Sequence, residues 1–144
     1  MTPQVCLSIT MQLLDTDLST IDFHRHLKRP PMQDWNNYRI SILKQIADYA
    51  ALAPDTMSGL SAMDAGTSKI GKLDAKVHEL IALAVAVTTR CDGCIAVHAK
   101  KASELGVSRE EIAEALSVAI TLNAGAALTY SARVLEAVDN LPKR

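Results

Sequence analysis

The sequence has few aromatic residues, and this scarcity favours helices over sheets. Only 3% of its 144 residues are aromatic, although 49% are hydrophobic. Strands prefer aromatic and β-branched side chains, whereas alanine and leucine, which are prominent here, form helices readily. We therefore expect an all-α protein with a core of small and branched aliphatic side chains.

An excess of one charge, a long hydrophobic run and a secretion signal are missing as well. The net charge is −1, so no basic surface indicates a nucleic-acid or anionic-membrane partner. The apolar run from Leu80 to Val87 is shorter than the roughly 20 residues that cross a bilayer. The chain does not begin with a positive segment followed by an apolar one. We expect a cytoplasmic protein, and in that reducing compartment a Cys-x-x-Cys pair is more often catalytic or metal-binding than structural.

The first 37 residues differ from the rest of the chain. They contain Pro30 and Pro31 and no sustained helical spacing of apolar residues. We expect an irregular N-terminal arm over residues 1–37, with at most a short helix at residues 19–27. Residues 38–144 form the predicted helical domain, whose size is ordinary for a single domain.

Apolar spacing and capping signals predict about six helices in this domain. They are expected at residues 38–53, 56–64 after a cap at Asp55, 74–90, 92–105 before the C′ glycine Gly106, from the Ser108–Glu111 capping box to an interruption at residues 123–125, and from there to about Val138. A loop is expected at residues 66–71. The helix at residues 74–90 is apolar nearly all round, so we expect it to be central and buried.

The densest group of reactive side chains lies between Cys91 and His98, a segment that holds two thiols and an imidazole. In a helix that begins near Cys91, the side chains of Cys91, Cys94 and His98 share one face. A helix N-terminus and a nearby imidazole both favour a thiolate at Cys94. Cys91 is within disulfide reach of Cys94, and His98 can accept its proton. This arrangement is typical of a dithiol that cycles through an intramolecular disulfide.

One carboxylate, Glu79, immediately precedes the apolar run that starts at Leu80. If Glu79 is buried, it needs a polar partner, because an unpaired buried charge is costly. Alternatively it occupies an exposed edge near the helix start, where a negative charge suits the helix dipole. The sequence leaves both possibilities open.

Zinc is the main rival use of these residue types, because two cysteines, a histidine and Glu79 resemble a mixed tetrahedral ligand set. No second Cys-x-x-Cys or His-x-His pair follows, however, and ligands crowded onto one helix are geometrically awkward. Buried free cysteines and a core histidine are the purely structural alternatives. Five further residues receive no functional role: Cys6, His24, His26, Trp35 and His78.

With these residues identified, the chain from about Asn37 to Val138 resembles the AhpD-like alkylhydroperoxidase / carboxymuconolactone decarboxylase family. The family pattern has a glutamate twelve residues before the first cysteine of Cys-x-x-Cys-x-x-x-His. The matching residues are Glu79, Cys91, Cys94 and His98, followed by Gly106, Glu110–Ala115 and Asn123–Gly125. Two departures accompany the match: Gly93 stands where the best-characterised peroxidase branch has a histidine, and the lactone decarboxylase branch generally lacks the cysteine pair.

The resemblance implies an all-helical fold that assembles into trimers or hexamers, with the active site near a subunit interface. Cys94 would attack the O–O bond of a small hydroperoxide, and Cys91 would resolve the sulfenic acid to a disulfide. His98 would accept the Cys94 proton, Glu79 would complete the proton relay, and an external dithiol would reduce the disulfide; no cofactor or metal is implied. We therefore expect a thiol-dependent alkyl hydroperoxide reductase with an antioxidant role. The alternatives are a general disulfide oxidoreductase and a non-enzymatic, redox-sensing or zinc-binding helical oligomer.

Overall fold

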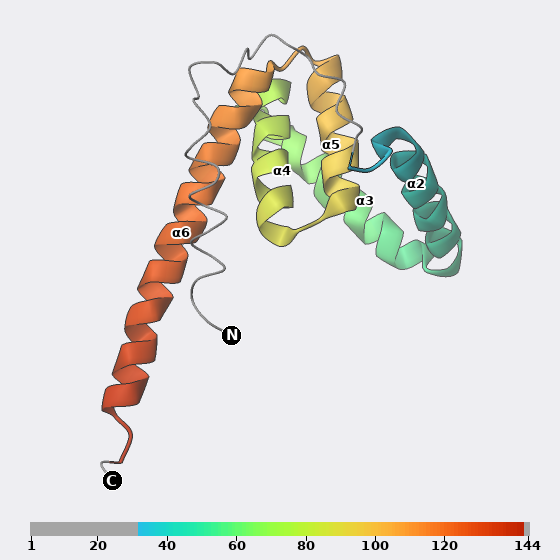
Figure 1. The fold of residues 1–144 in the computed structure, drawn as a ribbon. Helices are drawn as coiled ribbons and strands as arrows, with labels where there is room; N and C mark the ends of the chain where they lie inside the picture. Colours follow the sequence, from blue (N-terminus) through green and yellow to red (C-terminus); the bar gives the residue numbers. More distant parts are fainter. Residues whose placement is uncertain (1–31, 143–144) are drawn as a thin grey trace. The chain divides into compact units, whose positions relative to one another are not determined.

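The computed structural model describes residues 32–142, and this range contains five helices and no strand (Figure 1). The helices are α2 (Trp35–Leu52), α3 (Pro54–Lys69), α4 (Ala75–Thr89), α5 (Asp92–Glu104) and α6 (Arg109–Asp139). All five belong to one compact unit that spans residues 33–144. The all-α fold class predicted from composition is confirmed.

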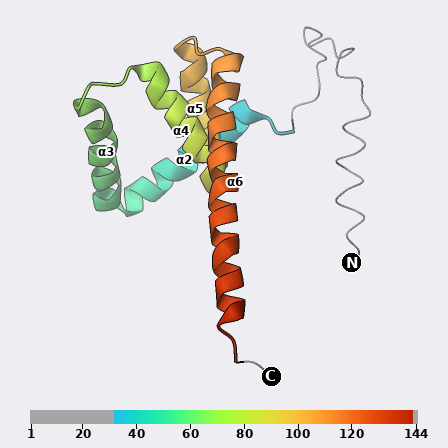
Figure 2. The ribbon, with the colours of Figure 1, turned by 90° about the vertical axis from the view of Figure 1, so that its left-hand side faces the viewer.

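The central helix is α4, which packs against both α5 and α6, while α2 packs against α5 and α3 (Figures 1 and 2). The core is small: Leu83, Ala102 and Val107 form its buried cluster, and Leu80 and Ile112 pack against it. Ala102 on α5 has no exposed surface, so a larger side chain there would push the helices apart. The expected central, buried helix is therefore α4, although its outer face stays open in the single chain.

Left-handed residues end α4 and α5. Arg90, with φ of 54°, ends α4, and Gly106, with φ of 71°, follows the end of α5, as predicted for a C′ glycine. The Nζ of Lys76 donates to the Gly106 carbonyl oxygen at 3.0 Å. This contact joins the first turn of α4 to the residue that follows α5 and adds to the packing between the two helices that hold the candidate site.

The predicted starts and lengths of the first two helices need correction. Helix α2 begins at Trp35 because the Asp34 side chain accepts a hydrogen bond from the Asn37 amide, so the helix starts three residues before the expected position. Helix α3 begins at Pro54 and runs to Lys69, so the short helix at residues 56–64 and the loop at 66–71 were wrong. Asp55 lies in the first turn of α3 rather than at its cap.

The interruption expected at residues 123–125 was also wrong, because α6 is continuous from Arg109 to Asp139. The Asn123 side chain donates to the Ala119 carbonyl oxygen within the same helix. The capping box of Ser108 and Glu111 is confirmed. The expected helix at residues 19–27 lies outside the described residues, and the irregular arm over residues 1–37 remains a prediction apart from the start of α2.

Much of α6 exposes apolar side chains in the single chain. Every residue from Ile120 to Pro142 is exposed, and Leu128 is 74% exposed. By length and composition alone α6 could cross a membrane. One such helix is weak evidence, since core helices of soluble proteins have the same composition. The expectation that no membrane is involved stays a prediction.

Candidate active site

Cys91 and Cys94 lie at the start of α5 and are joined by a disulfide, with their Cα atoms 5.3 Å apart. Cys91 is the N-cap of the helix, and its sulfur accepts a hydrogen bond from the Cys94 amide at 3.1 Å. The Cys91 amide in turn donates to the Ala86 carbonyl oxygen at 3.0 Å. The end of α4 therefore holds the residue from which α5 begins, and both sulfurs lie at a helix N-terminus, where negative charge is favoured.

Glu79 on α4 and His98 on α5 are joined by a hydrogen bond, with 2.7 Å between Oε2 of Glu79 and Nδ1 of His98. The Glu79 side chain is 13% exposed and that of His98 is 28% exposed. Glu79 therefore does not occupy an exposed edge of the helix, which was one of the two possibilities that the sequence left open. Because the carboxylate accepts only, Nδ1 carries the proton, and Nε2 of a neutral His98 is left as an acceptor. This ring nitrogen is available as a base.

The Cys91–Cys94 disulfide and the Glu79–His98 pair lie next to each other, because Cys94 and His98 both belong to α5. Cys94 and His98 are four residues apart in the helix, so they lie one turn apart on the same face. In the oxidised state described here the Cys94 sulfur is bonded to Cys91, while within residues 32–142 His98 is paired with Glu79. The structure thus brings Glu79 to His98 and Cys91 to Cys94, and α5 places the two pairs side by side.

A cavity of about 380 Å³ opens beside the Glu79–His98 pair, between α3, α4 and α5. Its walls are formed by Asp64, Thr67, Leu73, His78, Glu79, Ile81, Ala82, His98 and Lys101. Sequence reasoning gave His78 no role and did not identify Lys101, although both line this cavity. Their positions one residue before Glu79 and three after His98 were the available signal.

The structure also bears on the remaining candidates. In the part of the chain that it describes, no three His, Cys, Asp or Glu side chains converge to hold a metal ion. Trp35 lines a different cavity, described below. A Cβ atom built on Gly93 would lie 3.7 Å from the Ile42 side chain of α2, so a histidine here would face α2. Cys6, His24 and His26 lie outside the described residues.

Comparison with known proteins identifies relatives over most of the chain. An uncharacterized protein of Haemophilus influenzae is 47% identical over 104 residues, which cover 72% of this chain and 92% of the relative. An uncharacterized protein from the cox locus of Paracoccus denitrificans is 39% identical over 98 residues, 64% of this chain and 88% of the relative.

Two solved structures show the same fold. The apo crystal structure of a carboxymuconolactone decarboxylase family protein from Legionella pneumophila is 36% identical, with a TM-score of 0.58 over 76% of this chain and 97% of that protein. A protein from Methanobacterium thermoautotrophicum is 30% identical, with a TM-score of 0.56 over 60% of this chain and 97% of that one. The model of the carboxymuconolactone decarboxylase family matches residues 54–137, and this chain belongs to that family.

Proposed function

We propose that the protein is a thiol-dependent hydroperoxide reductase with an antioxidant role. The observation that carries the proposal is the Cys91–Cys94 disulfide at the start of α5, one helical turn from a histidine that Glu79 holds by Nδ1. A dithiol beside an oriented base suits peroxide reduction, because the base takes the thiol proton and the second thiol resolves the sulfenic acid. Family membership supports the same reading.

In the reduced protein, the Cys94 thiolate attacks the terminal oxygen of a hydroperoxide ROOH. The O–O bond breaks, Cys94 becomes a sulfenic acid, and the alkoxide leaves and takes up a proton to become ROH. The Cys91 thiolate then attacks that sulfur, water leaves, and the disulfide forms. An external dithiol is oxidised in reducing the disulfide, which returns the two electrons.

His98 and Glu79 move the protons in this scheme. Nε2 of His98 takes the Cys94 proton, and the Glu79 carboxylate stabilises the imidazolium that results. The 380 Å³ cavity beside the pair accommodates the organic part of the hydroperoxide.

Stopped-flow measurement of thiol loss with hydrogen peroxide and with an alkyl hydroperoxide tests the proposal. Cys94→Ser should abolish peroxide consumption, and Cys91→Ser should leave a sulfenic acid at Cys94 that dimedone traps for mass spectrometry. Cys6→Ser is the matched control and should consume peroxide normally. Failure of the fully reduced wild-type protein to consume either peroxide rejects the proposal.

A general disulfide oxidoreductase is the second candidate, and Gly93 favours it. Gly93, which immediately precedes Cys94, has no side chain that could relay a proton during peroxide cleavage, yet thiol–disulfide exchange needs only the dithiol. The reduction potential of the Cys91–Cys94 pair, measured with rates for peroxide and disulfide oxidants side by side, separates the two functions.

We further propose that the protein acts as a homo-oligomer, a trimer or hexamer, in the cytoplasm. The apolar side chains that α6 exposes, among them Leu122, Leu128 and Leu135, support this proposal, because large exposed apolar surface is typical of interfaces between subunits. The external dithiol reductant, a protein or a small thiol, is the other partner that the redox cycle requires.

A further inference from the structure

A second, larger cavity lies between the start of α2 and the face of α5 that points away from the disulfide. Its volume is about 650 Å³, which is within the range of small-molecule sites. The lining residues are Trp35, Asn36, Arg39, Ile95, Ala96, Ala99, Lys100, Ser103 and Glu104. It shares no residue with the cavity beside Glu79 and His98, so nothing in the redox scheme accounts for it.

One wall of this cavity is flat and apolar. Trp35 contributes its indole, which is steadied by an edge-to-face contact with Tyr38 at 6.1 Å between ring centroids. Ile95, Ala96 and Ala99 line the cavity from α5, and the two alanines leave room above the helix. Such a wall suits a planar or hydrocarbon body, since aromatic faces stack favourably on one another.

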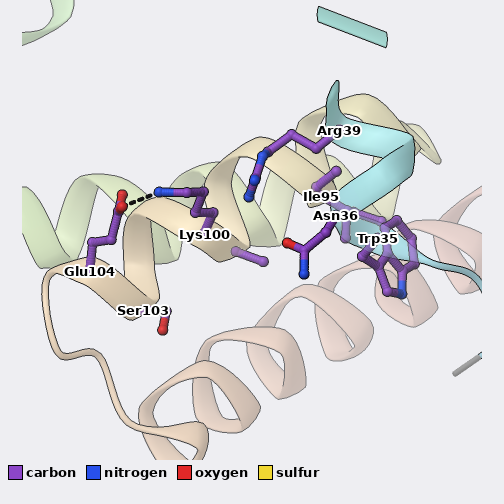
Figure 3. Close-up of a pocket in the computed structure, with 9 residues that line it drawn as sticks. Trp35, Asn36, Arg39, Ile95, Lys100, Ser103 and Glu104 are labelled. Carbon is purple, nitrogen blue, oxygen red and sulfur yellow. Dashed lines mark hydrogen bonds and ion pairs between the residues drawn. The ribbon is translucent and has the colours of Figure 1, made fainter. Parts of the chain in front are cut away.

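The other wall is positively charged. Figure 3 shows the Arg39 side chain reaching from α2 toward Lys100 on α5. Lys100 forms an ion pair with Glu104. The hydrogen bond from Lys100 and the Lys100 charge lower the pKa of the Glu104 carboxyl, and the Arg39 charge contributes a smaller lowering. Glu104 is thus ionised at neutral pH, which leaves two cations against one carboxylate.

Arg39 is the cation that remains free for a ligand. Within residues 32–142 the Glu79 carboxylate contacts His98 and the Glu104 carboxylate pairs with Lys100, and neither contact engages the guanidinium. Arginine presents a planar fork that binds a carboxylate through two parallel hydrogen bonds. Asn36 and Ser103 supply further hydrogen-bonding groups at the rim.

We propose that this cavity binds a small aromatic carboxylate, with its ring against Trp35 and its carboxylate on Arg39 beside Lys100. The charged and the apolar wall face one space, so a ligand must carry both an anion and a flat apolar body to use them. The site is independent of the peroxide chemistry and lies on the opposite face of the helix that carries Cys94.

The chain contains a reporter for this test, because Trp35 is its only tryptophan. The probe is 3-phenylpropionate, which does not absorb at the 295 nm used to excite tryptophan; the full-length protein is titrated and binding is repeated by calorimetry. A ligand of this size is expected to bind with Kd on the order of 1 mM. The uncharged isostere 3-phenylpropionamide should bind at least about tenfold more weakly, a difference that corresponds to one lost charged hydrogen bond.

Variants identify the residue responsible. Arg39→Gln should weaken 3-phenylpropionate at least about tenfold without changing the affinity for the amide, and Lys100→Gln, which frees the Glu104 carboxylate, should weaken it too. Lys44→Gln is the matched control, an exposed cation on α2 outside the cavity, and should bind as wild type. Equal affinity for acid and amide, an unaffected Arg39→Gln variant, or no binding because a second copy of the chain covers Trp35 would each overturn the proposal.

Discussion

Glu79 illustrates how one charge can act through a neighbour. Its carboxylate lies 2.7 Å from Nδ1 of His98 and is largely shielded from solvent. A negative charge in that place stabilises the protonated imidazole, and a protonated imidazole near Cys94 stabilises the thiolate. The charge of Glu79, and not only its hydrogen bond, should therefore set how readily Cys94 ionises.

Glu79→Gln keeps a hydrogen-bonding side chain but removes the charge. We expect the pH midpoint for alkylation of reduced Cys94 by iodoacetamide to rise by about one unit, with up to about tenfold slower alkylation at pH 7. The measurement uses protein in which Cys6 and Cys91 are serine, so that Cys94 alone reacts. Glu114→Gln, at an exposed carboxylate on α6, is the control; an unchanged midpoint in Glu79→Gln would show that Glu79 does not act on Cys94.

At the scale of single residues, the sequence predicted which side chains share α5 but not which meet across helices. Cys91, Cys94 and His98 follow from helical spacing alone. The contact between Glu79 and His98 joins residues 19 apart on different helices, and it depends on how α4 packs against α5. That Lys101 and Arg39 line cavities could not be predicted from the sequence. The cavity at Lys101 forms between α3, α4 and α5, and the cavity at Arg39 forms between α2 and α5.

Two glycines, one inside α3 and one after its end, differ in what a side chain there would cost. Gly59 lies inside α3 with no atom within 4 Å of an added Cβ, whereas Gly71 follows α3 with φ of +64°. Alanine loses less chain entropy than glycine inside a helix, but it is strained in the left-handed region.

Gly59→Ala should therefore raise the free energy of unfolding by about 0.5–1 kcal/mol, and Gly71→Ala should lower it by about 1–2 kcal/mol. Urea unfolding followed by circular dichroism, at one fixed protein concentration, measures both. Destabilisation by Gly59→Ala would mean that this face of α3 is packed against something outside the described chain.

The start of α6 should make stability depend on pH. The Ser108 amide donates to Glu111, and this bond lowers the pKa of Glu111 below its usual value of 4.5. A carboxyl group whose pKa is lowered by folding stabilises the protein above its unfolded pKa, and this contribution is lost as the pH falls through the folded pKa. Glu111→Gln should be less stable than wild type near pH 7, and the difference should shrink progressively below about pH 4.5. Unfolding free energies across pH 3–7 test this; a constant difference contradicts it.

The sequence predicted that the helices exist, but it did not predict all of their ends. Capping chemistry placed the starts of α4 and α6 correctly, because Asp74 and Ser108 bond to their own first turns. Glycine was the misleading signal at two positions: Gly66 lies within α3 and Gly125 lies within α6. Continuity of the hydrogen-bonded helix outweighs a penalty of about 1 kcal/mol for each glycine.

For the whole molecule, the apolar surface is large relative to the core. The fully or nearly buried hydrophobic residues of the described chain are mostly alanines, whereas Leu122, Leu128 and Leu135 on α6 are exposed. A core of this kind stabilises a single chain poorly. We infer that association completes the fold.

Leu128→Glu combined with Leu135→Glu places two charges seven residues apart on one face of α6, at positions 74% and 67% exposed in the single chain. We expect the proposed oligomer to dissociate, with a fall in apparent melting temperature that depends on protein concentration. Light scattering coupled to size-exclusion chromatography measures the mass. Arg133→Glu on the same helix is the control and should keep the wild-type mass; an unchanged mass for the double variant would show that α6 is not the interface.

The Cys91 sulfur takes part in two interactions at the start of α5. It is bonded to the Cys94 sulfur, and it accepts a hydrogen bond from the Cys94 amide. Any chemistry at that sulfur must therefore alter the first hydrogen bond of the helix. Amide hydrogen exchange at Cys94 is therefore a measure of the oxidation state of the cysteine pair that needs no substrate. The exchange rate of this one amide should differ between the oxidised and the reduced protein.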